Sequence, residues 1–87
     1  MLRCGTSIGA NVREAQNAES KKDFIHKMAI AQKEADETMY FLELLYATEY
    51  LIESVYLSIH KETEEVYKII KSIIISTKQN MNTASNK

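Results

Sequence analysis

The sequence predicts an all-α fold, an antiparallel up-down helical bundle, and three observations lead to this prediction. The 87 residues contain no proline and only two glycines, Gly5 and Gly9, so the strongest breakers of regular structure are missing after Ala10. Apolar residues recur at steps of three and four, the spacing of one helix face. Hydrophobic residues make up 45% and charged residues 26% of the chain, which is ordinary for a folded domain and excludes disorder as the starting assumption.

The first predicted helix covers residues 2–18, where Ile8, Val12 and Ala15 follow helical spacing. Each glycine costs about 1 kcal/mol relative to alanine inside a helix, but also lets a neighbouring backbone approach closely. We interpret both glycines as small contact residues, because the lysine and hydroxyl residue of a phosphate-binding loop do not follow them.

The second predicted helix covers residues 21–47. Ser20 and Asp23 form a shortened capping box at its start. A sustained apolar seam follows, the pattern of a helix with one buried face. Its members are Phe24, Met28, Ala31, Ala35, Met39, Leu42 and Leu45.

The third predicted helix covers residues 54–78, and its seam consists of Tyr56, Ile59, Thr63, Val66, Ile70, Ile73 and Thr77. The β-branched run at 69–75 is also compatible with a strand. Flanking lysines and the length of the periodic segment favour a helix that is contacted on two sides. We expect one helical domain over residues 1–78 and a polar, disordered tail over residues 79–87.

A domain of this size buries only about 60% of the surface its unfolded chain exposes. Wide apolar faces on three helices therefore predict an uncovered surface that another helix covers. We expect that helix to come from a partner chain, in a non-enzymatic module that self-assembles through helix packing.

Charge is divided along the chain. Residues 1–33 carry a net charge of +3, residues 34–65 carry −8 and residues 66–87 carry +4. An antiparallel hairpin of the second and third helices brings the lysines toward one end and the acids toward the other. The alternative function is RNA binding by this basic end; otherwise the charges form only a solvated surface. The candidate nucleic-acid-binding residues are Lys21, Lys22, Lys27, Lys33, Lys68, Lys71 and Lys78.

Residue spacing argues against several other classes of function. A di-iron bundle needs Glu-x-x-His pairs, and neither His26 nor His60 follows a glutamate by three residues. No nucleophile, base and oxyanion donor come together, so we expect no enzyme, metal, cofactor or small-molecule substrate. A single cysteine and the lack of a signal peptide or long apolar run indicate a cytoplasmic protein without a membrane partner. The candidate structural polar contacts are Asn11, Glu14, Glu34 and Glu37.

Three groups of residues over roughly positions 2–50 resemble a known family. They are the Ser-Ile-x-x-Asn-x-x-Glu pattern from Ser7 to Glu14, the Ser-x-x-Asp-Phe pattern from Ser20 to Phe24, and the pair Glu37-Thr38. The chain is similar in these patterns to the four-helix-bundle proteins encoded in intervening sequences of 23S rRNA genes, also called S23 ribosomal proteins.

The resemblance implies a left-handed four-helix bundle that forms a ring-like homo-oligomer, a pentamer, with no catalytic activity. A related group of accessory proteins contacts nucleic acid through basic surfaces, whereas the net charge here is −1. Family members carry a full helix ahead of the segment matched by Leu2. We therefore expect three helices of a four-helix bundle with the first helix missing, through either a shortened chain or a start that lies further upstream.

Overall fold

The computed structural model describes the backbone of residues 2–85 and the side chains of residues 7–80. It contains three helices, α1 (Leu2–Gln16), α2 (Lys21–Ala47) and α3 (Glu53–Ser85). The described backbone includes no strand, so the all-α prediction is confirmed and the strand alternative for residues 69–75 is wrong.

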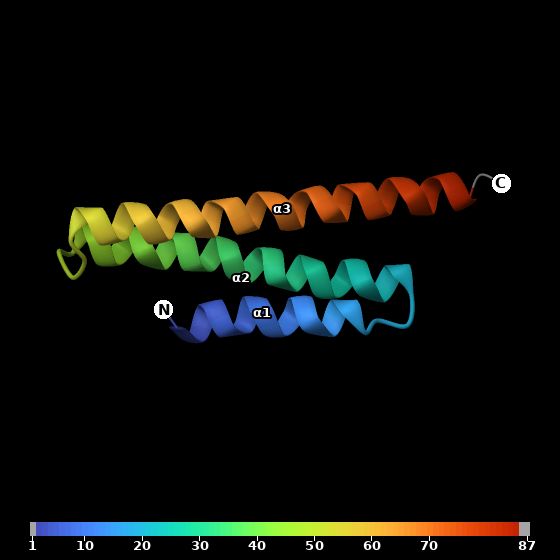
Figure 1. The fold of residues 1–87 in the computed structure, drawn as a ribbon, viewed down its shortest axis with the longest axis horizontal. Helices are drawn as coiled ribbons and strands as arrows, with labels where there is room; N and C mark the ends of the chain where they lie inside the picture. The colour runs from blue at the N-terminus through green and yellow to red at the C-terminus, as the bar shows by residue number, and fades with distance from the viewer. Residues whose placement is uncertain (1, 86–87) are drawn as a thin grey trace.

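The three helices lie antiparallel to their neighbours in an elongated body measuring 54 × 19 × 15 Å (Figure 1). Helix α2 packs against both α1 and α3. Over the described backbone, α1 and α3 make no close backbone approach to each other, although both contribute side chains to one core cluster. The up-down order is as predicted, and α2 is the central helix to which both others attach.

Helix α2 begins where the capping pattern predicts. The Ser20 hydroxyl accepts a hydrogen bond from the backbone N–H of Asp23 at 3.0 Å. This bond satisfies one of the donors that a helix start leaves without an internal partner. Helix α1 ends at Gln16, two residues earlier than predicted, in a tight turn in which the N–H of Asn17 bonds the carbonyl of Glu14 at 3.1 Å.

Helix α2 ends in a turn that contains no glycine. Glu49 adopts a left-handed conformation with φ of 65°. The N–H of Glu49 bonds the carbonyl of Tyr46 at 3.0 Å, and the N–H of Tyr50 bonds that of Leu45 at 2.8 Å. This pair of bonds is the Schellman arrangement, in which glycine usually occupies the left-handed position. Hydrogen bonding therefore sets the hairpin turn despite the backbone cost at Glu49.

Helix α3 starts at Glu53 and continues to Ser85, so the predicted end at residue 78 is wrong. The backbone of residues 79–85, where a disordered tail was expected, is helical in this structure, and residues 86–87 lie outside the described part of the chain. No proline or glycine interrupts this segment, and helix propagation adds one hydrogen bond for each residue fixed.

The core lies where α2 meets its two neighbours. Ala15 of α1, Met28 and Ala31 of α2, and Ile70 and Ile74 of α3 form one buried cluster. Four half-buried apolar residues pack around this cluster: Ile8, Val12, Phe24 and Ile25. The predicted seam of α2 lies on the buried side of the helix, with Phe24, Met39 and Leu45 only half-buried.

The seam of α3 is rotated from the predicted one. Ile74 is 7% exposed, whereas Val66 and Ile73, which the sequence pattern places on the buried face, are 39% and 37% exposed. Among the three consecutive isoleucines, only the middle one enters the core. Val66 and Ile73, which were expected to be buried against α2, are therefore partly exposed to solvent.

The adjacent residues Ile74 and Ile75 provide a matched test of this packing. Ile74→Ala is expected to lower the free energy of unfolding by about 2–5 kcal/mol, because it opens a cavity in the core. Ile75→Ala, at a position 47% exposed, is expected to change it by no more than about 0.5 kcal/mol. Denaturant unfolding at low protein concentration measures both; equal losses would contradict the observed rotation of α3.

Candidate interaction surfaces

The contacts of α2 show which sides of the central helix are covered. Toward α1, the Lys27 ammonium donates a hydrogen bond to the Glu14 carboxylate at 3.1 Å. This bond and the nearby negative charge raise the pKa of Lys27. Toward α3, the ring of Tyr46 stacks on that of Tyr56 with centroids 4.5 Å apart. The two neighbours thus occupy different sides of α2.

The side of α3 next to its buried face carries an uncovered apolar stripe. Tyr56 and His60 turn toward α2, where the His60 imidazole lies 3.6 Å from the Glu43 carboxylate. At 100° per residue, Val66, Ile69 and Ile73 fall on the opposite flank of the buried face. Ile69 is 59% exposed. We call Val66, Ile69 and Ile73 the open edge of α3.

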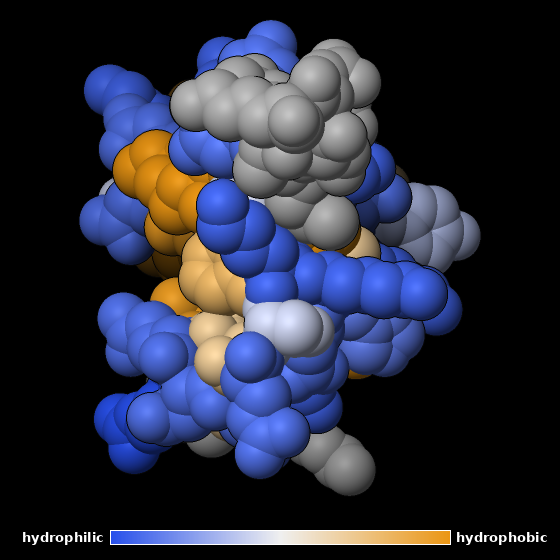
Figure 2. Space-filling view, turned by 90° about the vertical axis from the view of Figure 1, so that its right-hand side faces the viewer, coloured by the Kyte–Doolittle hydropathy of each residue, from blue (hydrophilic) through white to orange (hydrophobic). Residues whose placement is uncertain are grey.

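Helix α1 has an uncovered side as well. A Cβ atom built on Gly9 would meet no atom within 4 Å, so nothing within the described chain requires glycine there. End-on, the molecule shows hydrophobic side chains gathered on one side between α3 above and α1 below, amid a largely hydrophilic surface (Figure 2). A helix that packs beside α1 and α3 would cover this side.

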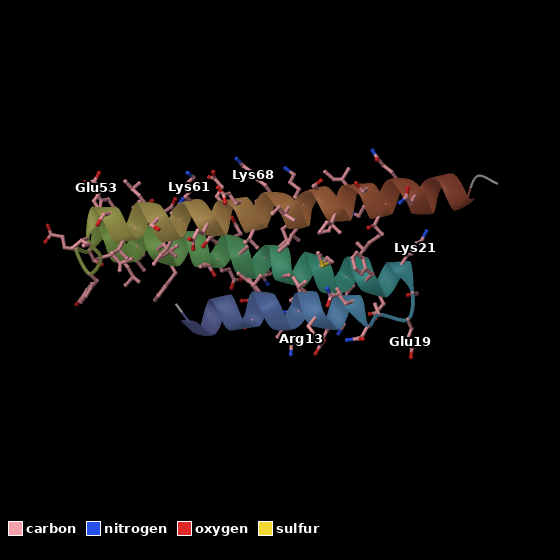
Figure 3. All side chains as sticks on the ribbon, in the orientation of Figure 1. Arg13, Glu19, Lys21, Glu53, Lys61 and Lys68 are labelled. Carbon is pink, nitrogen blue, oxygen red and sulfur yellow. The ribbon has the colours of Figure 1, made fainter. Side chains whose placement is uncertain are left out.

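The seven candidate nucleic-acid-binding lysines do not form one cluster. Lys27 is bound to Glu14, and Lys68 lies 3.5 Å from Glu64 in an exposed pair. The other five make no ion pair with any residue that the structure describes: Lys21, Lys22, Lys33, Lys71 and Lys78. Lys21 lies at the end of the molecule opposite Glu53 (Figure 3). The basic residue Lys21 and the acidic residue Glu53 therefore lie at opposite ends of the molecule. The candidate lysines of α3 are spread along that helix between residues 68 and 78.

The candidate structural polar contacts behave differently from one another. The Asn11 amide donates to the Ser7 carbonyl at 2.9 Å, within α1 itself. Glu14 joins α1 to α2 through Lys27. The carbonyl of Glu34 accepts from the Thr38 hydroxyl at 2.8 Å, while the side chains of Glu34 and Glu37 make no hydrogen bond or ion pair over the described residues. Glu14 is thus the only candidate of the four seen to connect two helices.

Several exposed apolar residues in the part of the chain around the hairpin turn were not singled out from the sequence. We call them together the tip patch. They come from the second half of α2, the connection and the start of α3, and are Tyr40, Phe41, Leu44, Tyr50, Ile52 and Leu57. Tyr50 is 79% and Ile52 67% exposed. The signal in the sequence is a connection with three large apolar residues, Tyr50, Leu51 and Ile52, between Glu49 and Glu53.

Among the described residues, no group of three or more histidine, cysteine, aspartate or glutamate side chains could hold a metal ion. None of the helices there has both the length and the apolar character needed to cross a membrane.

Comparisons with known proteins agree with the helical-bundle class that the geometry defines. The model of the family described as 23S rRNA-intervening sequence protein matches residues 1–72. The chain belongs to this family. No curated protein matches it significantly.

One solved structure is similar along most of the chain. It is a protein of unknown function from the S23 ribosomal protein family, from Bacteroides thetaiotaomicron VPI-5482. The two chains share 56% sequence identity with a TM-score of 0.82, and the match covers 84% of this chain and 68% of the other. The similarity supports the family and the all-α fold, and neither description names a catalytic activity.

Gly9 provides a test of the uncovered side of α1. Gly9→Ala is expected to raise the free energy of unfolding by about 0.5–1 kcal/mol, because alanine loses less backbone entropy and has free space for its Cβ. The reverse change at the next exposed position, Ala10→Gly, should lower it by a similar amount. Denaturant unfolding of the two variants provides the measurement. Measured on the dilute single chain, destabilisation by Gly9→Ala would contradict the open space at this position.

Proposed function

We propose that this protein is a non-catalytic helical module that acts by self-assembly through helix packing. The observation that carries the proposal is the open edge of α3, which lies beside the buried core and is not covered by α1. Contiguous exposed apolar surface of this kind marks an interface. A second copy brings apolar helix faces of matching character, and the ring-like pentamer implied by the resemblance is one closed form of such an assembly.

The side chains on this edge favour helix packing over binding of a small molecule. Val66, Ile69 and Ile73 are spaced by three and four residues, which forms a ridge along α3. Gly9 of α1 has open space around its Cα, so a neighbouring helix could approach α1 closely at this position. The partner surface is therefore elongated and apolar, as the surface of another helix is.

Ile69→Asp tests the proposal. A buried, unpaired carboxylate in the interface is costly, so the assembled mass measured by multi-angle light scattering is expected to fall toward that of one chain. The fold should persist, because Ile69 is 59% exposed within the single chain.

Ala29→Asp serves as the control, since Ala29 is exposed on a different side of the bundle, on α2. It is expected to leave the assembled mass unchanged. A wild-type protein that remains a single chain up to high concentration would refute self-assembly. Equal assembled masses for the wild type and Ile69→Asp would show that the assembly contact does not involve the open edge of α3.

The alternative function is RNA binding by the basic end. Lys21 and Lys22 begin α2, Lys78 lies in the last part of the antiparallel α3, and none of them makes an ion pair with a described residue. Unpaired lysines near one another can neutralise phosphates and release counterions. Lys27 contributes less to such binding, because its charge is already matched by Glu14.

The combined variant Lys21→Glu, Lys22→Glu and Lys78→Glu tests this alternative by light scattering with and without RNA. RNA binding by the wild type should weaken as salt rises, and the variant should lose it. Lys61→Glu, in the acidic half of the chain, is the control and should retain binding. If wild-type protein does not bind RNA at low salt, the alternative is rejected.

A further inference from the structure

The tip patch combines apolar surface with acidic charge. Glu49 and Glu53, both exposed, lie on either side of the exposed residues Tyr50 and Ile52. Neither carboxylate forms an ion pair with a described residue. A surface that packs here must therefore be apolar at its centre and basic around it.

The outer side of α3 has the complementary character. A shallow hollow there is lined by Lys68, Lys71, Ser72, Ile75 and Ser76. Lys68 projects from the side of α3 that faces away from α2 (Figure 3). Ile75 is 47% exposed and supplies an apolar floor, while Lys71 forms no ion pair with any described residue. We call this surface the basic hollow.

The two surfaces cannot meet within one chain. Glu53 and Lys71 lie on the same continuous helix, and the rise of 1.5 Å per residue separates them by about 27 Å. No side chain spans that distance. If they make contact, they do so between two copies.

We propose that the tip patch of one copy docks into the basic hollow on α3 of a second copy. The inference rests on the proposed self-assembly and names a contact for it that is separate from the open edge of α3. Ile52 and Tyr50 would pack on Ile75, while Glu49 and Glu53 pair with Lys71 and compete with Glu64 for Lys68. Because the two surfaces differ, the contact is heterologous, and repeating it builds a closed ring or an open chain of copies.

Charge reversal tests this contact in the full chain. Lys68→Glu with Lys71→Glu, and separately Glu49→Lys with Glu53→Lys, should each weaken assembly roughly tenfold, since each places like charges together. The variant that carries all four changes restores opposite charges across the contact. Its assembly measured by light scattering should return toward the wild-type level, and higher salt should weaken the wild-type assembly.

Two controls separate the contact from general effects of charge. Lys21→Glu with Lys22→Glu changes the net charge as much as Lys68→Glu with Lys71→Glu, yet should leave assembly unchanged. Ile52→Ser should weaken assembly without changing the thermal unfolding of the dilute single chain, because Ile52 is 67% exposed.

The outcomes distinguish this inference from the proposed function. If the wild-type protein never assembles, both the proposed self-assembly and the docking of the tip patch are refuted. A wild-type protein that assembles, but responds to the Lys68 and Lys71 reversal no more than to the Lys21 and Lys22 control, overturns only the docking of the tip patch. Failure of the fourfold variant to recover, with its helical content intact, does the same.

Discussion

The packing of α2 against both of its neighbours is the constraint on which the rest of the structure depends. Ala31 and Ala35 on α2 are fully buried, and Ala15 of α1 is 2% exposed. Small residues at a helix contact let the two backbones approach closely, so larger side chains from the third helix can fill the shared core. Ile70 and Ile74 do this from α3. Since α1 and α3 both pack on α2, loss of this packing would remove the main support of each.

The sequence predicted the number, order and direction of the helices because their signals are local. Ser20 and Asp23 mark a helix start through one hydrogen bond across three residues. The rotation of α3 is a different kind of property. Ile73, Ile74 and Ile75 are chemically identical, and only contacts with residues far away in the sequence distinguish them, since Ile74 packs in the cluster that contains Met28 and Ala15. Helical periodicity therefore does not predict which of the three isoleucines is buried; the packing of the three helices determines it.

The candidate site shows the same division between local and packed information. Which lysines are exposed follows from helix periodicity, and the separation of charge along the chain follows from counting residues. The pairing of Lys27 with Glu14 joins two helices across thirteen positions, so no local pattern reveals it. The tip patch was missed for a related reason. Tyr50 and Ile52 resemble core residues in composition, and only the geometry of the Glu49 turn exposes them.

Folding and assembly are physically connected in a chain with this architecture. One central helix supports two others, and among the described residues the buried cluster has five members, two of them alanines. A partner that covers the open edge binds the folded form and not the unfolded one, so it stabilises the fold by mass action. The apparent stability of the protein should therefore depend on its concentration. The exposed apolar surface that weakens the single chain is then the same surface from which the assembled form gains its stability.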